Sequence, residues 1–152
     1  MRRPDGSLGL SLGILRKTCC VVAAIACGGC GDVVDTRLPS DYRAWAIDSS
    51  EETSIWDLRA EKGSDPVVPD GVEAVGCQAN WIVATRHPIA GNFLSRKQNL
   101  GILEYWVIDT KTRHVVGPLT EAQFHAKEVQ IGISSIRFDP VSSEGLCVAD
   151  PR

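Results

Sequence analysis

The chain has 152 residues, a length that predicts a single domain. Hydrophobic residues make up 43% and charged residues 23%, which is typical of a globular protein and excludes a wholly disordered chain. Sixteen Lys and Arg residues against nineteen Asp and Glu residues give a net charge of −3, which argues against a nucleic-acid-binding protein.

The charge is unevenly distributed along the chain. Residues 1–30 contain one acidic residue, Asp5, and four basic residues, which are Arg2, Arg3, Arg16 and Lys17. Without these, 12 basic and 18 acidic residues are left, so residues 31–152 carry a net charge of −6. The part of the chain that is expected to fold is therefore acidic.

The N-terminal region has the pattern of an export signal. Arg16 and Lys17 precede the uncharged residues 18–31, which are fourteen in number. This stretch is shorter than the roughly 20 apolar residues of a membrane-spanning helix. A basic segment, a short apolar segment and then small residues are typical of a signal peptide. A buried core helix is the alternative, and Gly28 and Gly29 oppose it. We therefore expect a signal peptide over residues 1–30 and export to the bacterial cell envelope.

Two cysteines at the end of this segment are candidates for lipidation. Ala24-Ile25-Ala26-Cys27 and Cys27-Gly28-Gly29-Cys30 both place small residues before a cysteine, as a bacterial lipobox does. The lipidation site is thus Cys27 or Cys30, and the sequence leaves both open. Two or more acyl chains, such as palmitate, anchor a protein stably, so we expect a protein that is anchored to a membrane without spanning it.

The sequence after the N-terminal segment predicts a tether and then a domain that begins with β-hairpins. Residues 31–41 are polar and predict a tether, and residues 42–152 predict a single globular domain. Six runs rich in β-branched and aromatic residues predict strands that pair as three hairpins: residues 42–48 with 53–59, 71–77 with 81–87, and 103–109 with 114–116. Gly117-Pro118 is expected to end the last strand, because proline cannot donate to a ladder. Residues 62–71 and 89–101 contain Gly, Pro or Asn and predict loops.

All four tryptophans fall inside predicted strands: Trp45, Trp56, Trp81 and Trp106. A shared aromatic core is the favoured interpretation, because aromatic side chains contribute large buried areas. A platform on which sugars stack is the alternative.

One helix is clearly marked, at residues 121–131. Thr120 as N-cap and Gln123 three residues later predict a capping box, and Gly132 suits the C-terminal end. A narrow apolar stripe is formed by Ala122, Ala126 and Val129, and a hydrophobic staple is predicted between Leu119 and Phe124. After the helix, residues 135–138 are a candidate last edge strand. The predicted fold class is α+β, with an antiparallel β-sheet of about six strands and one packed helix.

Two stretches of the chain resemble a known family. One stretch contains Ala74-Val75-Gly76 and ends at His87-Pro88. The other contains Tyr105 to Asp109 and then Gly117-Pro118-Leu119-Thr120 with Phe124. They resemble a domain-of-unknown-function family of small bacterial lipoproteins, over about residues 42–133. The resemblance implies a signal peptide, a lipidated cysteine and an extracytoplasmic β-rich domain, and the family has no established catalytic residues.

The sequence offers little for catalysis or metal binding. His87, His114 and His125 are widely spaced, with no local pattern of metal ligands, so no metal and no cofactor are predicted. His87 is expected to make a local hydrogen bond at its strand end, and it is the best candidate if the protein is an enzyme. Four acidic residues are candidates for acid–base chemistry but are expected to be solvated strand ends: Asp48, Asp57, Glu104 and Asp109.

Cys77 and Cys147 are the two cysteines that remain if Cys30 is lipidated. Export places them in an oxidising compartment, where a disulfide between them is one possibility and two buried free thiols are the other.

These observations favour a membrane-anchored envelope lipoprotein that is a non-catalytic accessory or binding module. Its expected partners are the membrane, through the N-terminal lipid, and an unknown envelope partner, with no nucleic acid. The alternatives are a small envelope hydrolase and an inhibitor of a secreted enzyme. An inhibitor needs a protruding loop, for which residues 66–71 and 89–101 are candidates.

Overall fold

The computed structural model describes residues 34–91, 95–142 and 146–147. The predicted signal peptide and the candidate lipidation sites Cys27 and Cys30 lie outside these residues. In chain order the elements are β1 (Asp35–Leu38), the 3-10 helix η1 (Pro39–Asp41), β2 (Tyr42–Trp45), the 3-10 helix η2 (Ser50–Glu52), β3 (Ser54–Asp57), β4 (Val72–Gln78), β5 (Trp81–Arg86), β6 (Ile89–Ala90), β7 (Lys97–Gln98), β8 (Glu104–Asp109), β9 (Val115–Leu119), α2 (Glu121–Ile131) and β10 (Asp139–Pro140).

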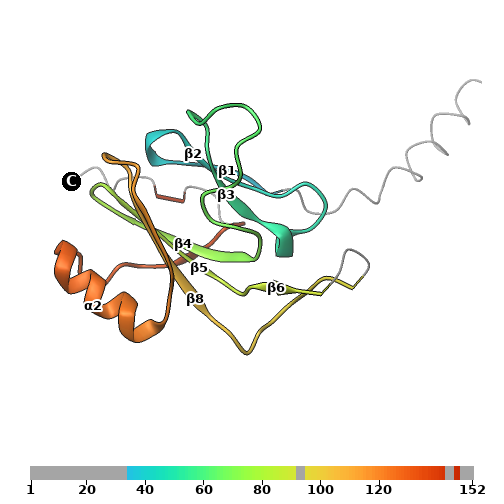
Figure 1. Ribbon diagram of the computed structural model, residues 1–152. Helices are drawn as coiled ribbons and strands as arrows, with labels where there is room; N and C mark the ends of the chain where they lie inside the picture. The colour runs from blue at the N-terminus through green and yellow to red at the C-terminus, as the bar shows by residue number, and fades with distance from the viewer. Residues whose placement is uncertain (1–33, 92–94, 143–145, 148–152) are drawn as a thin grey trace, which may run out of the picture. The chain divides into compact units, whose positions relative to one another are not determined.

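The strands form three antiparallel sheets (Figure 1). The small sheet has the order β1-β2-β3, the large sheet has the order β10-β4-β5-β8-β9, and β6 pairs with β7. The predicted α+β class is confirmed. The expectation of one sheet with about six strands is corrected, because ten strands in the described residues divide among three sheets.

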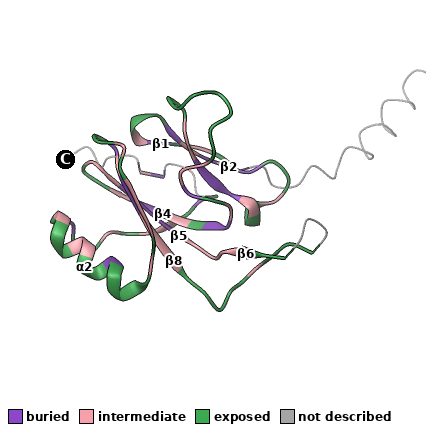
Figure 2. Ribbon diagram, in the orientation of Figure 1, coloured by how far each residue is buried: buried purple, intermediate pink, exposed green. Residues whose placement is uncertain are grey.

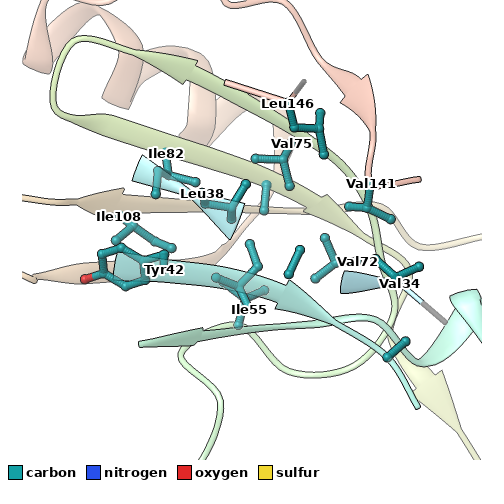
Figure 3. Close-up of a cluster of buried hydrophobic side chains, with 14 residues drawn as sticks. Val34, Leu38, Tyr42, Ile55, Val72, Val75, Ile82, Ile108, Val141 and Leu146 are labelled. Atoms are coloured by element: carbon teal, nitrogen blue, oxygen red, sulfur yellow. The ribbon is translucent and has the colours of Figure 1, made fainter. Parts of the chain in front are cut away.

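Two hydrophobic clusters arrange the domain in layers. The larger cluster joins the inner face of the small sheet to one face of the large sheet, through side chains such as Tyr42, Ile55, Val75 and Ile82 (Figure 3). The smaller cluster joins the other face of the large sheet to α2 and the segment after it, through Val83, Val107, Phe124 and Ile133. Since successive side chains of a strand point to opposite faces, neighbours in one strand enter different clusters.

Strand β5 lies at the centre of the large sheet and is buried on both faces (Figure 2). Ile82 and Ala84 enter the larger cluster, and Val83 enters the smaller one. A strand that is buried on both faces reads as a continuous apolar run, and this explains the sequence Trp-Ile-Val-Ala-Thr.

Residues 34–41, the described part of the expected tether, belong to the folded domain instead. Asp35–Leu38 form β1, which pairs with β2 along its whole length, and Val34 is buried. The Ala46 N–H donates to the Val34 carbonyl, with 2.9 Å between nitrogen and oxygen. The strand was missed because its sequence, Asp-Thr-Arg-Leu, is polar and has only one fully buried side chain, Leu38.

The three predicted hairpins are present, and the third is longer than expected. β8 pairs with β9, which continues through Gly117 and Pro118 to Leu119. Pro118 is tolerated because β9 is the edge strand of the sheet, where a missing N–H removes no necessary ladder bond. The Gly117–Pro118 peptide bond is cis.

The helix has the predicted boundaries but a different buried face. Thr120 and Gln123 form the capping box, and Gly132 adopts a left-handed conformation with φ of 70°. The stripe expected from Ala122, Ala126 and Val129 is wrong, since all three are exposed and Val129 is 83% exposed. Phe124 is buried instead, and its ring stacks on Tyr105 of β8 with 4.7 Å between centroids and 7° between planes.

The segment after the helix runs across β4 before it pairs with that strand. Residues 135–138, the candidate edge strand, are not a strand, and β10 pairs with Val75 and Ala74 one residue later. The chain passes so close to Gly76 that a Cβ atom there would collide with the Arg137 carbonyl. Glycine is therefore needed at this crossing because the backbones approach closely.

A disulfide joins Cys77 of β4 to Cys147, with 5.1 Å between the Cα atoms and 70 residues between them in sequence. Of the two alternatives that the sequence left open, the structure therefore contains the disulfide. Leu146 is buried in the larger cluster, so the crosslink holds the end of the described chain against the core.

Candidate functional site

His87, the best catalytic candidate in the sequence, follows β5 and has both ring nitrogens close to protein oxygens. Its Nδ1 atom is 2.7 Å from the carbonyl oxygen of Ile102, to which it donates. Its Nε2 atom is 3.3 Å from Oε2 of Glu73 in β4. The backbone N–H of His87 donates to the Gly71 carbonyl at 3.0 Å. We call this set of contacts the His87 clasp.

The His87 clasp differs from the arrangement of a catalytic histidine. A general base needs one ring nitrogen directed at the group whose proton it takes. Here neither nitrogen is directed at a serine, threonine or cysteine; one faces a carbonyl and the other a carboxylate. The hydrogen bonds are not local either, because Ile102 is 15 residues away in sequence. The geometry ties the end of β5 to β4 and to the segment before β8.

The four acidic candidates have separate roles. Asp57 forms an ion pair with Arg113, and Glu104 forms one with Arg86 at 3.1 Å between Oε2 and Nε. Asp109 accepts a hydrogen bond from the Thr112 hydroxyl at 2.8 Å, and this bond lowers the pKa of Asp109. Asp48 is exposed. Asp57 is therefore not the solvated strand end that was expected, since its side chain is only 10% exposed.

The three histidines lie in three different parts of the fold. His87 follows β5, His114 precedes β9, and His125 is in α2. His125 contacts Glu128 at 2.6 Å, and this hydrogen bond raises the pKa of His125. Within the described ranges, no group of three or more His, Cys, Asp and Glu side chains is placed to hold a metal ion.

An arm of the chain leaves the large sheet between β5 and β8 and contains β6 and β7. Arg96 in this arm forms ion pairs with Asp70 and with Glu52, the latter at 3.7 Å. The Gln98 amide donates to the Glu51 carbonyl at 3.3 Å. These contacts hold the returning part of the arm, which contains β7, against η2 and Asp70.

Asp70 is the centre of this attachment. Its Oδ1 accepts a hydrogen bond from the buried hydroxyl of Ser54 at 2.5 Å, and its Oδ2 contacts Arg96. Partial burial by itself raises the pKa of Asp70, but the hydrogen bonds from Ser54 and Arg96 outweigh it and place the pKa below its usual value. The contacts that hold the arm therefore need Asp70 in its carboxylate form.

The arm ends in a tight turn that displays apolar side chains, which we call the apolar turn (residues 99–103). The Ile102 N–H donates to the Asn99 carbonyl at 3.0 Å, and the Gly101 N–H donates to Asn99 Oδ1 at 3.2 Å. The Asn99 N–H donates to the Pro88 carbonyl at 2.9 Å. Leu100, Ile102 and Leu103 are nevertheless 71%, 47% and 42% exposed.

The apolar turn is the feature that sequence reasoning missed. Residues 89–101 were expected to be a polar loop, but Leu100-Gly101-Ile102-Leu103 is a short apolar run at its end. Exposed apolar side chains that lie together on a surface can mark a contact surface. Its backbone is held by three hydrogen bonds within and beside the turn and by the His87 clasp.

The tryptophans do not form the shared core that was favoured. All four are partly exposed, Trp106 packs against the larger cluster and Trp81 against the smaller one. Trp45 and Trp56 contact each other edge to face, with 6.0 Å between centroids. Arg43 lies over Trp45 at 5.4 Å and pairs with Asp35 at 2.6 Å. The outer face of the small sheet thus carries Asp35, Arg43, Trp45 and Trp56, and we call these residues the tryptophan face.

Residues 39–142 match the family described as Protein of unknown function (DUF3997). The chain belongs to this family. No curated protein and no solved structure matches the chain. The predicted membership of a domain-of-unknown-function family is confirmed.

The matched region extends from η1 to the segment after β10. It contains the His87 clasp, the arm and the apolar turn, so these belong to the DUF3997 region. Among the described residues, no helix is both long and apolar enough to cross a membrane.

Proposed function

We propose that this DUF3997 protein is an exported bacterial envelope lipoprotein, anchored to a membrane by an acylated cysteine and acting as a non-catalytic accessory or binding module. The apolar segment after Arg16-Lys17, with Cys27 and Cys30 at its end, supports the anchor. Two acyl chains would give stable attachment, in which the folded domain stays outside the bilayer.

The observation that carries this proposal is the disulfide between Cys77 and Cys147. Structural disulfides persist in oxidising compartments and are rare in the cytosol, where thiols are kept reduced. A disulfide that crosslinks β4 to Cys147 therefore supports export of the folded domain, independently of the N-terminal sequence pattern.

The position of the first strand supports a membrane-proximal domain. Val34 is buried and β1 begins at Asp35, so only a few residues separate the core from either cysteine. At roughly 3.3–3.6 Å per residue, the chain reaches at most about 14 Å from Cys30 to Val34 and about 25 Å from Cys27. A domain with this short connection stays close to the membrane surface.

The non-catalytic role is supported by the His87 clasp. The hydrolase alternative needs a free nitrogen on His87, but both ring nitrogens are directed at protein oxygens.

The tryptophan face is the surface on which we expect the envelope partner to bind, because Trp and Arg are frequent among residues that dominate binding energy.

Metabolic labelling tests the anchor. Cells that express the full chain are fed radiolabelled palmitate, and the label on the protein is measured for the wild type, Cys27→Ala, Cys30→Ala and the double variant. We expect label on the wild type and loss of label when the lipidated cysteine is replaced. Cys19→Ala is the matched control, since Cys19 lies earlier in the same segment and should leave the label unchanged. An unlabelled wild-type protein in the membrane-free fraction would contradict the proposal.

A further inference from the structure

Most of the strongly exposed apolar side chains belong to two short segments of the chain. Six large hydrophobic residues are exposed in the part of the chain that the structure describes. Four of them lie in these segments: Ile47, which follows β2, and Leu100, Ile102 and Leu103 in the apolar turn.

The contacts place both segments at one end of the domain. Ala46 is hydrogen-bonded to Val34, so Ile47 follows directly after the point where the N-terminal chain enters the fold. The next element, η2, is attached to the arm through the Glu51 carbonyl and Gln98. In Figure 1, β6 extends from this same side of the domain. We call this region the exit end.

We infer that the exit end rests on the lipid bilayer, with Leu100 at the tip of the apolar turn entering the membrane interface. This inference rests on the proposed lipid anchor. The short chain between the cysteines and Val34 restricts which surface can face the membrane, and the exit end is where that chain emerges.

The charges at the exit end favour an apolar contact over an electrostatic one. Asp48, Glu51 and Lys97 are exposed there, and the guanidinium of Arg96 is already paired with Asp70 and Glu52. A surface that docks by attraction to anionic lipids carries a cluster of basic residues, which this end lacks in the described ranges. A membrane of zwitterionic lipid is therefore the expected surface.

The contact between the exit end and the membrane is small, and it becomes stable only because the lipid anchor holds the domain at the membrane. Three or four apolar side chains bind a membrane only weakly by themselves, but a lipid anchor nearby gives them a high effective concentration. The His87 clasp and the Asn99 hydrogen bonds also hold the turn in one conformation. The turn thus loses little conformational entropy when it docks.

Quenching by lipid-borne bromine tests the inference. The full chain carrying Leu100→Trp is purified from membranes and reconstituted in phosphatidylcholine vesicles that are brominated on the acyl chains. Leu58→Trp is the matched control, because Leu58 is 50% exposed and its N–H bonds to Asp41, beyond the other end of β3. We expect the added emission at position 100 to lose most of its intensity and the added emission at position 58 to keep it.

A second variant separates docking from simple insertion of the new tryptophan. Ile102→Asp in the Leu100→Trp protein should restore most of the emission, because a carboxylate opposes entry of the turn into the membrane. Equal quenching at positions 100 and 58 overturns the inference, as does quenching at position 100 that Ile102→Asp leaves unchanged.

Palmitate labelling of the same preparation distinguishes the two proposals. Labelled protein with no preferential quenching at position 100 retains the anchor and refutes the docked turn. Protein that carries no label refutes the anchor, and the docked turn that rests on the anchor then fails with it.

Discussion

His87 shows how one side chain connects three parts of the domain. It lies where Pro88 ends β5, and its ring reaches Glu73 of β4 and the carbonyl of Ile102 in the apolar turn. A histidine at a strand end is visible in the sequence, but its two partners are 14 and 15 residues away along the chain. Those partners follow only from sheet register and from the path of the arm, which local patterns do not encode.

Replacing His87 should loosen the apolar turn. In His87→Ala the Ile102 carbonyl loses its donor, so amide hydrogen exchange at residues 99–103 should accelerate. The free energy of unfolding should fall by about 1 kcal/mol, the usual net effect of one hydrogen bond. Exchange is followed by mass spectrometry, with His114→Ala as control because His114 is exposed and precedes β9. Unchanged exchange at the turn in His87→Ala would show that the clasp does not order it.

Asp70 should make the attachment of the arm sensitive to acid. Because the pKa of Asp70 is lower in the folded protein, its contribution to stability is present above the unfolded value of about 4 and is lost as pH falls through the folded value. The carboxylate is about a third exposed, so solvent limits the effect to about 1 kcal/mol.

Chemical denaturation of Asp70→Asn as a function of pH measures this contribution. The difference in unfolding free energy from the wild type should be largest at neutral pH and should shrink below about pH 4. Asp65→Asn, an exposed aspartate in the preceding loop, should show no such difference. A difference for Asp70→Asn that stays constant down to pH 2 would count against a charged Asp70 in the attachment of the arm.

Among the elements, those with local signals were predicted best. The boundaries of α2 follow from the capping box at Thr120 and the glycine at 132, which act within one turn of the chain. Its buried face was wrong because the stacking of Phe124 on Tyr105 depends on a distant strand. β6, β7 and β10 have two residues each, too few for any alternation of polar and apolar residues to show.

The edge strand β9 is packed closely at Gly117. A Cβ atom at this position would lie 2.5 Å from Cδ2 of Trp106, so Gly117→Ala should destabilise the protein by about 1–3 kcal/mol through overpacking. Trp106→Leu removes the ring, and the double variant should recover part of the loss in a double-mutant cycle measured by denaturation. Strictly additive effects of the two substitutions would show that the ring is not the obstacle.

At the scale of the whole molecule, the disulfide closes a long loop around the core. Cys77 and Cys147 are separated by 70 residues, so the crosslink restricts the unfolded chain strongly. The double variant Cys77→Ser/Cys147→Ser should lose about 2–4 kcal/mol in unfolding free energy. Denaturation of the wild type with and without a reductant gives the same comparison, and reduction should have no effect on the double variant. A wild type equally stable in both conditions would contradict a stabilising disulfide.

The layered arrangement could be foreseen only in outline. Alternation in the strands and the single capped helix predicted an α+β domain, and the buried run in β5 is consistent with layers on both sides. The separation of the small sheet β1-β2-β3 from the large sheet was not visible, because β1 has a polar sequence and is recruited by its pairing with β2. The apolar turn could not be predicted either, because the exposure of Leu100 depends on the contacts that hold the arm against the rest of the domain.

Intact mass spectrometry of the protein purified from native membranes tests the central proposal most directly. A lipid-anchored, exported domain predicts a chain that begins at Cys27 or Cys30, carries the added mass of a diacylglycerol group, and is two hydrogens lighter than its reduced form because of the Cys77–Cys147 bond. A chain that begins at Met1 and carries neither the lipid mass nor the disulfide would contradict it.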